Sequence, residues 1–185
     1  MGKDPGEPSV MQPWIESSQL SATWSELAIV SGEVVGFLFG MVESQKPKGA
    51  GFKEISDQLW MFRRFLSSDA GRFEIPFKTL LGFLFMEFKL TVNRPKADAE
   101  IILLIVDSRF RGKGIGKTLV DRFVKAAREA NSHAIAVYTD DKSSNWRFYE
   151  IYGFRKVSKF YDNISSYFAG EHANAIYYVL DLAAK

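Results

Sequence analysis

The run Arg111–Gly116, RGKGIG, has the residue types of an anion-binding loop. It follows an apolar run that ends at Val106 and leads into a sequence with helical periodicity. Glycines let successive backbone N–H groups converge, and the positive end of a helix dipole favours an anion at the start of the helix. Arg111, Lys113 and Lys117 add positive charge. We therefore predict that this loop binds a phosphate group.

Two common phosphate-binding motifs do not fit the loop. A Walker A motif that ends in Gly116, Lys117 and Thr118 requires glycine at the position of Arg111. A Rossmann GxGxxG motif that begins at Gly112 requires glycine at the position of Lys117. The sequence therefore indicates neither a P-loop nucleotide triphosphatase nor a dinucleotide-binding enzyme.

A third motif, R/Q-x-x-G-x-G/A after an apolar strand, is met by Arg111, Gly114 and Gly116. A second element, FYEIYGF at 148–154, follows the next strand-like run. With both elements, the sequence over roughly 99–154 resembles the GNAT superfamily of acetyl-CoA-dependent N-acetyltransferases. The resemblance implies an α/β (α+β) fold with a mixed, mostly antiparallel sheet flanked by helices. It also implies acetyl-CoA as the acetyl donor.

The resemblance further implies which residues hold the coenzyme. In the family the loop amides bind the pyrophosphate, and backbone groups of the preceding strand pair with the pantetheine arm where the sheet splays. Contacts also come from the loop before the FYE element, where the usual asparagine is replaced here by Lys142 and Asn145 lies nearby. The expected cofactor-binding residues are Leu104, Ile105, Val106, Arg111, Gly112, Lys113, Gly114, Ile115, Gly116, Lys117 and Asn145.

Acetyl transfer to an amine requires the neutral amine, and a lysine-type amine with a pKa near 10.4 is only about a thousandth neutral at pH 7. A base or a water relay is therefore needed. By resemblance, Tyr149 matches the family tyrosine that lies near the coenzyme sulfur, and we expect it to be the general acid. Glu100 has the spacing from Arg111 of the basic glutamate in histone acetyltransferases. Each residue also has a structural alternative. Tyr149 could be an aromatic residue of the core, and Glu100 could be a polar residue at the solvated start of a strand.

The remaining pattern predicts the elements that position this site in a single domain over 1–185. Residues 1–22 are expected to be a flexible lead-in, and 45–98 a helical insertion rich in Phe and Trp, with apolar faces over 55–66 and 77–88. Ala99–Val106 has the apolar run of a central strand. The other expected elements are a hairpin over Glu26–Glu43, a helix with the stripe Leu119, Phe123, Ala126 and Ala130, a strand over His133–Tyr138, a short helix from Ser143 or Ser144 to Gly153, and strands over Phe154–Phe160 and Ala175–Leu182.

Composition excludes several classes of chemistry. The chain has 185 residues, no cysteine and two histidines, so disulfides, thiolate metal sites and a cysteine nucleophile are excluded and no metal is expected. A formal net charge of +2 does not indicate a nucleic-acid partner. No run is long and uncharged enough for a membrane span, and no secretory signal is recognised, so we expect a cytoplasmic protein.

The combined expectation is an N-acetyltransferase that moves acetyl from acetyl-CoA to a primary amine by direct transfer in a ternary complex, since no cysteine can carry the acetyl group. The alternative is a non-catalytic acyl-CoA-binding or regulatory domain with the same fold. The acceptor is left open among a small amine, an antibiotic, a peptide N-terminus and a protein lysine. A homodimer is also left open.

Overall fold

The computed structural model describes residues 8–47, 85–86, 88–142 and 145–182 and forms one six-stranded sheet in the order β1-β2-β3-β4-β6-β5. Between described strands, β3 and β4 form the single parallel pair, and all other neighbours are antiparallel. This confirms the predicted mixed, mostly antiparallel sheet. The strands are β1 (Trp24–Val30), β2 (Glu33–Val42), β3 (Ala99–Val106), β4 (Ala134–Asp140), β5 (Arg155–Tyr161) and β6 (Asn174–Asp181). The helices are α1 (Pro8–Ser21), α4 (Ile115–Glu129), α5 (Arg147–Tyr152) and α6 (Asn163–Ala169), with 3-10 turns at Glu43–Gln45 and Ser108–Phe110.

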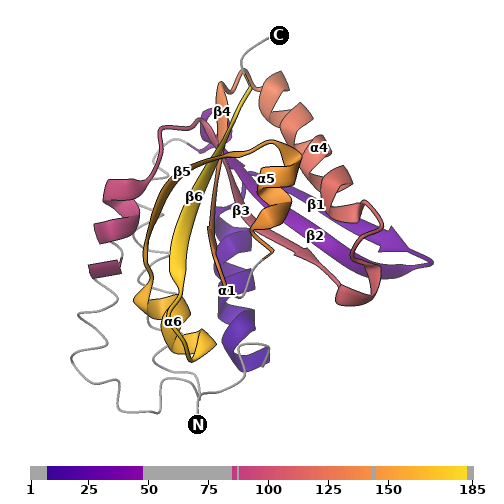
Figure 1. The fold of residues 1–185 in the computed structure, drawn as a ribbon. Helices are drawn as coiled ribbons and strands as arrows, with labels where there is room; N and C mark the ends of the chain where they lie inside the picture. Colours follow the sequence, from indigo (N-terminus) through magenta and orange to yellow (C-terminus); the bar gives the residue numbers. More distant parts are fainter. Residues whose placement is uncertain (1–7, 48–84, 87, 143–144, 183–185) are drawn as a thin grey trace.

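The sheet splits between its two middle strands. β3 pairs with β2 from Ala99 to Val106 except at Ile102, but with β4 only from Ala99 to Ile101. The β2–β3 register shifts beside Ile102, which has no β2 partner, and a bulge of this kind bends and twists a strand. Figure 1 shows the halves β1-β2-β3 and β4-β6-β5 close together at one end and spread apart at the other. We call the space between the diverging parts of β3 and β4 the β3–β4 opening.

Helix α4 packs on one face of the sheet and builds the main core with it. The contact is close, because a Cβ atom at Gly40 of β2 would lie 2.3 Å from the ring of Phe123. Glycine at this position therefore lets the helix approach the sheet. The apolar face predicted for this helix is correct at Phe123, which is buried. Towards the end of the helix the buried face is shifted by one residue, since Ala127 is fully buried while Ala126 and Ala130 are only partly buried.

The expectation of a flexible lead-in is wrong over Pro8–Ser21, which forms helix α1. Proline is tolerated in the first turn of a helix, as at Pro8, but Pro13 is unfavourable inside one. Helix α1 packs against β2 and β3, and tertiary packing of this kind overrides weak intrinsic propensity. Residues 1–7 lie outside the described residues.

Most of the predicted helical insertion over 45–98 also lies outside the described residues, including the whole helix expected over 55–66. Residues 85–86 and 88–93 are helical, which agrees with the end of the second expected helix. Its face was predicted wrongly at Phe88, which is 63% exposed, while Met86 is fully buried. Phe85 and Val92 share the exposed face with Phe88.

The second half of the fold follows the sequence closely, with one addition. The short helix α5 ends at Gly153, whose φ of 114° is the left-handed conformation predicted for this C-cap. The expected capping residues Ser143 and Ser144 lie outside the described residues. Helix α6 was not predicted, and it inserts between β5 and β6 after Asp162. Within the described ranges, no helix combines the length and the apolar composition that crossing a bilayer requires.

Candidate functional site

The loop after β3 is fastened to the β1–β2 hairpin by charged groups. Asp107 Oδ1 accepts a hydrogen bond from the backbone N–H of Arg109 at 2.8 Å, which starts the 3-10 turn. The Arg109 guanidinium also contacts Asp107 Oδ2 at 2.7 Å and Glu33 Oε1 at 2.6 Å. Hydrogen bonds from Arg109 hold the pKa of Asp107 below its usual value. The loop therefore leaves the strand in a defined direction.

Two glycines of the loop adopt the left-handed backbone conformation. Gly112 has a φ of 76° and Gly114, the residue before helix α4, has a φ of 81°. No atom lies within 4 Å of a Cβ built at either position, so glycine is needed for its backbone conformation and not for space. The amide of Thr118 donates to the Gly114 carbonyl at 2.9 Å and is the first to bond back within α4. In an α-helix the amides that precede this first bond have no partner within the helix.

The open edge of β3 leads directly to this loop. On one side Leu104, Ile105 and Val106 pair with β2, and on the other side pairing with β4 has ended at Ile101. The guanidinium of Arg111 folds back, and its Nε donates to the Val106 carbonyl at 3.1 Å. The backbone groups of this edge can form ladder hydrogen bonds with an amide-containing ligand that enters as an extra strand. The predicted pantetheine-binding residues therefore border an opening that ends at the glycine loop.

Tyr149 lies in the core beside this region. Its side chain is 8% exposed, and its ring packs against Phe154, Tyr178 and Phe148 at centroid distances of 5.6, 6.1 and 5.3 Å. Burial raises the pKa of Tyr149 far above its ordinary value. The hydroxyl therefore remains protonated at every physiological pH, as a proton donor must.

The neighbour of Tyr149 links helix α5 to the loop. A Cβ atom at Gly116, in the first turn of α4, would lie 3.7 Å both from the ring of Phe148 and from Val106 at the end of β3. The end of β3, the start of α4 and helix α5 therefore meet at one place. Asn145 lies exposed just before α5, and its carbonyl accepts from the Phe148 amide at 3.0 Å.

Glu100 lies apart from this meeting point. It pairs with Ala136 where β3 and β4 are still joined, six residues and about 20 Å of strand from Val106. Its carboxylate forms an ion pair with the guanidinium of Arg94. The structure therefore places Glu100 at the closed end of the β3–β4 opening, opposite the glycine loop.

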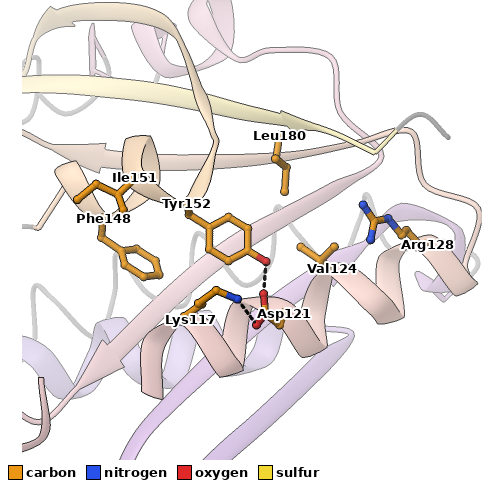
Figure 2. Close-up of a pocket in the computed structure, with 8 residues that line it drawn as sticks. All are labelled: Lys117, Asp121, Val124, Arg128, Phe148, Ile151, Tyr152 and Leu180. Carbon is orange, nitrogen blue, oxygen red and sulfur yellow. Dashed lines mark hydrogen bonds and ion pairs between the residues drawn. The ribbon is translucent and has the colours of Figure 1, made fainter. Parts of the chain in front are cut away.

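A groove of about 590 Å³ separates helices α4 and α5, and Figure 2 shows the residues around it. At its centre Asp121 joins the two helices: Lys117 Nζ contacts Asp121 Oδ2, and the Tyr152 hydroxyl donates to Asp121 Oδ1, both at 2.7 Å. The hydrogen bond from Lys117 holds the pKa of Asp121 below its usual value. Among the residues that line the groove, Lys117 is the one that the sequence analysis named as a cofactor-binding residue. The full lining is Lys117, Asp121, Val124, Arg128, Phe148, Ile151, Tyr152 and Leu180.

Two further polar residues near the β3–β4 opening were missed by the sequence analysis. They are Tyr138, on β4, and Asp162, which is fully buried after β5. A signal for Asp162 existed, because aspartate directly before NISS is a favourable helix N-cap. No cluster of histidine or acidic side chains that could hold a metal ion is found among the described residues.

Comparison with known proteins gives one family and one type of fold. The model of the Acetyltransferase (GNAT) family matches residues 3–154. The chain is similar in structure to the ribosomal-protein-S18-alanine N-acetyltransferase of Escherichia coli, with a TM-score of 0.52, 12% identity, and coverage of 92% of this chain and 76% of that one. It is also similar to an N-acetyltransferase of Staphylococcus aureus Mu50, with a TM-score of 0.51, 16% identity, and coverage of 96% and 79%.

A third structure is a candidate streptothricin acetyltransferase from Bacillus anthracis str. Ames in complex with acetyl coenzyme A. Its TM-score is 0.49 and its identity 17%, and the match covers 85% of this chain. The chain spans 61% of the length of that protein. No curated protein matches the sequence.

Proposed function

The chain belongs to the acetyltransferase (GNAT) family, and on that premise we propose that it transfers an acetyl group from acetyl-CoA to a primary amine by direct transfer in a ternary complex. The observation that carries this proposal is the continuity of two features. The edge of β3 that β4 leaves open runs into a loop whose glycines have left-handed backbone conformations. A ligand that carries both a diphosphate and an arm with two amide groups needs both features. The loop amides suit the diphosphate, and the open strand edge suits the arm.

The residues present fit acetyl-CoA as the donor. Amides from Gly112 to Lys117 would bind the diphosphate, and the edge from Leu104 to Val106 would pair with the pantetheine amides. Arg111 would release the Val106 carbonyl that it contacts in this structure. The bound donor supplies an activated thioester. The groove between α4 and α5 starts at Lys117, so it is the cavity into which we place the nucleotide end of the donor.

The chain's own residues perform positioning and proton transfer. Holding the amine against the thioester contributes most of the acceleration, because bringing two reactants together in one orientation removes an entropic barrier. Tyr149 would donate its proton to the departing sulfur. Asn145, exposed before α5, is proposed to contact the donor. With no cysteine in the chain, the acetyl group would pass directly to the amine.

Glu100 is the base that the family resemblance proposes. Its carboxylate is on the strand that borders the β3–β4 opening and forms an ion pair with the Arg94 guanidinium. Glu100 would reach an acceptor amine or a water molecule only where that group takes the place of Arg94.

The acceptor is proposed at the level of a primary amine. The E. coli protein of similar fold is named for acetylating the alanine of a ribosomal protein, so a peptide N-terminus is one class to test. A small amine, an antibiotic amine and a protein lysine are the others.

A homodimer is proposed on the exposed apolar face of Phe85, Phe88 and Val92, and sedimentation equilibrium tests it.

Calorimetry with acetyl-CoA, followed by a thiol-release assay, tests the proposed function. The amine panel contains a tetrapeptide with a free N-terminus, a lysine peptide with a blocked N-terminus, an aminoglycoside and 2-phenylethylamine. We expect saturable binding of acetyl-CoA and amine-dependent thiol release with at least one class. Binding without release from any amine favours the non-catalytic acyl-CoA-binding domain. Absence of binding by folded protein contradicts both.

A further inference from the structure

Tyr138 lies where β4 separates from β3. The side chains of Ile135 and Val137 belong to the core under α4, so Tyr138, one residue further, points to the opposite face of the sheet. The last β3–β4 pair joins Ile101 to Val137, and Tyr138 is therefore the first β4 residue beyond the paired segment. Its side chain is partly exposed. Tyr138 thus lies at the narrow end of the β3–β4 opening, on the face away from α4.

The Tyr138 hydroxyl has a fixed orientation. It donates its proton to Asp162 Oδ2 at 2.6 Å, and its ring packs 5.6 Å from that of Tyr177. Burial, and then the charge of Asp162, raise the pKa of Tyr138 far above its ordinary value, so the hydroxyl stays neutral. Because its one proton points at Asp162, its oxygen can accept a hydrogen bond from a group that approaches from the other side, in addition to its interaction with the Ser165 hydroxyl.

Asp162 is a fully buried carboxyl group at the end of β5. Its Oδ1 accepts from the Ser165 amide at 2.9 Å, and its Oδ2 accepts from the Ser165 hydroxyl at 2.6 Å in addition to Tyr138. These bonds cap helix α6, but the cap needs one oxygen and the second faces Tyr138.

We infer that the Tyr138 hydroxyl contacts the acceptor amine and that Asp162, through Tyr138, receives the proton that the amine loses during acetyl transfer. This inference rests on the proposed function and names the acceptor-side machinery of the same site. Tyr149 belongs to the core on the α4 side of the sheet, so Tyr149 and Tyr138 lie on opposite faces of the sheet.

The proton and bond changes balance. The nitrogen lone pair of a neutral amine forms a bond to the thioester carbonyl carbon, and the carbon–sulfur bond breaks. The nitrogen proton passes to Tyr138 Oη as the proton of Tyr138 passes to Asp162 Oδ2. The departing sulfur takes the proton of Tyr149. After the amide leaves, the proton on Asp162 returns through Tyr138 to water, and water restores the proton of Tyr149.

Glu100 lies on the same face of the sheet, since it alternates with the core residues Ala99 and Ile101. The two candidate bases therefore lie on one face of the sheet. Glu100 forms an ion pair with the guanidinium of Arg94. Asp162 accepts hydrogen bonds from the hydroxyl groups of Tyr138 and Ser165, and these hydroxyl groups can follow a proton by turning.

Two substitutions separate proton transfer from helix capping. Tyr138→Phe removes one hydroxyl and leaves the cap. Asp162→Asn keeps an oxygen for the Ser165 amide but offers Tyr138 an N–H donor, which turns the hydroxyl proton towards the acceptor. We expect each to lower kcat for the best amine of the panel by about a hundredfold, the lower bound for general acid–base catalysis. The acetyl-CoA Kd should stay within about twofold, because the coenzyme-binding groups lie on β3 and α4.

The matched control is Tyr177→Phe, which also removes a tyrosine hydroxyl on this face, one that donates to the Leu90 carbonyl at 3.4 Å. We expect its kcat to stay within about threefold of the wild type. An unchanged kcat in Tyr138→Phe overturns the inference, and so does a loss in Asp162→Asn that Tyr138→Phe does not share. In both cases the wild type is active and the proposed function stands. A wild type that binds acetyl-CoA but releases no thiol with any amine overturns both.

A second readout does not depend on turnover. Protein labelled with ¹³C at tyrosine Cζ is titrated with 2-phenylethylamine in the presence of coenzyme A, which carries no acetyl group to transfer. The Tyr138 resonance is assigned by its loss in Tyr138→Phe, and the Tyr177 resonance by its loss in Tyr177→Phe. We expect a saturable shift of the Tyr138 resonance and a constant Tyr177 resonance. A Tyr138 resonance that does not move under saturating amine contradicts the contact.

Discussion

The two sides of the β3–β4 opening consist of different kinds of chemical groups: main-chain groups on one side and side chains on the other. The proposed donor side, residues 104–117, is one continuous stretch that offers main-chain groups: a strand edge and the amides at the start of α4. The proposed acceptor side is formed by side chains, with Tyr138 on β4 and Asp162 after β5, which come together only in the folded chain. The donor side should therefore be sensitive to backbone conformation, and the acceptor side to the loss of single polar atoms.

The largest effect should come from a change of backbone conformation on the donor side. Gly114→Val places a β-branched residue at a φ of 81°. We expect the acetyl-CoA Kd measured by calorimetry to rise by about a hundredfold or more. The strain of about 1–2 kcal/mol is relieved by moving the loop amides, and each hydrogen bond to the charged diphosphate that is lost in this way costs about 1.5–3 kcal/mol.

Gly32→Val is the matched control for this prediction. Gly32 has a φ of 83° in the β1–β2 turn, and a Cβ there also meets open space, so the strain is the same but the site is distant. Its melting temperature should fall while its acetyl-CoA Kd stays unchanged. Equal losses of affinity in the two variants would show that the loop amides are not the binding groups.

The next effect concerns the proton donor beside the opening. Tyr149→Phe keeps the ring packing with Phe154 and Tyr178 and removes the hydroxyl. We expect kcat to fall by about a hundredfold with acetyl-CoA affinity unchanged, in line with the loss of a general acid. The control Tyr178→Phe loses a hydroxyl that donates to Glu150 at 2.9 Å and should lose about 1 kcal/mol of stability, with kcat largely retained. If the Tyr149→Phe enzyme kept its full kcat, Tyr149 would be a core aromatic residue and not the general acid.

A smaller effect is expected at Glu100, and it decides which side-chain group is the base. Glu100→Gln removes a carboxylate that is already paired with Arg94. We expect kcat to fall by less than about tenfold, below the range of a true general base. A loss of a hundredfold, measured by thiol release with the same amine, would transfer the role of the base from Asp162 to Glu100.

The smallest effect is on stability at low pH. Burial raises the pKa of Asp141, but hydrogen bonds from Asn174 and Lys159 outweigh it and lower the pKa from 3.8 to about 2. Because the folded pKa is lower than the unfolded one, Asp141 stabilises the protein above about pH 4, and this contribution is lost as the pH falls through about 2. Urea midpoints of wild type and Asp141→Asn should differ at pH 6 and converge near pH 2. A pH-independent difference would contradict the assignment.

Parts of the fold that depend on local signals were predictable. The hairpin, the apolar strand β3, the glycine loop and the Gly153 helix end all follow from residue type and spacing, and the structure has each of them. Helix α1 was missed because its prolines and serines have poor helix propensity, and packing on the sheet compensates for them. The bulge at Ile102 was missed because it depends on the register between β2 and β3, which no single strand reveals.

The sequence by itself determined the strand, glycine loop and helix that make up the proposed donor side. Left-handed glycines, a preceding apolar strand and a following helix are short-range features, so neighbouring residues specify them regardless of the rest of the chain. Only the tertiary structure decided how far β3 and β4 stay joined, that Arg94 holds Glu100, and that Tyr138 meets a buried Asp162. The physical reason is that such contacts join residues far apart in the chain, whose meeting depends on strand register and packing.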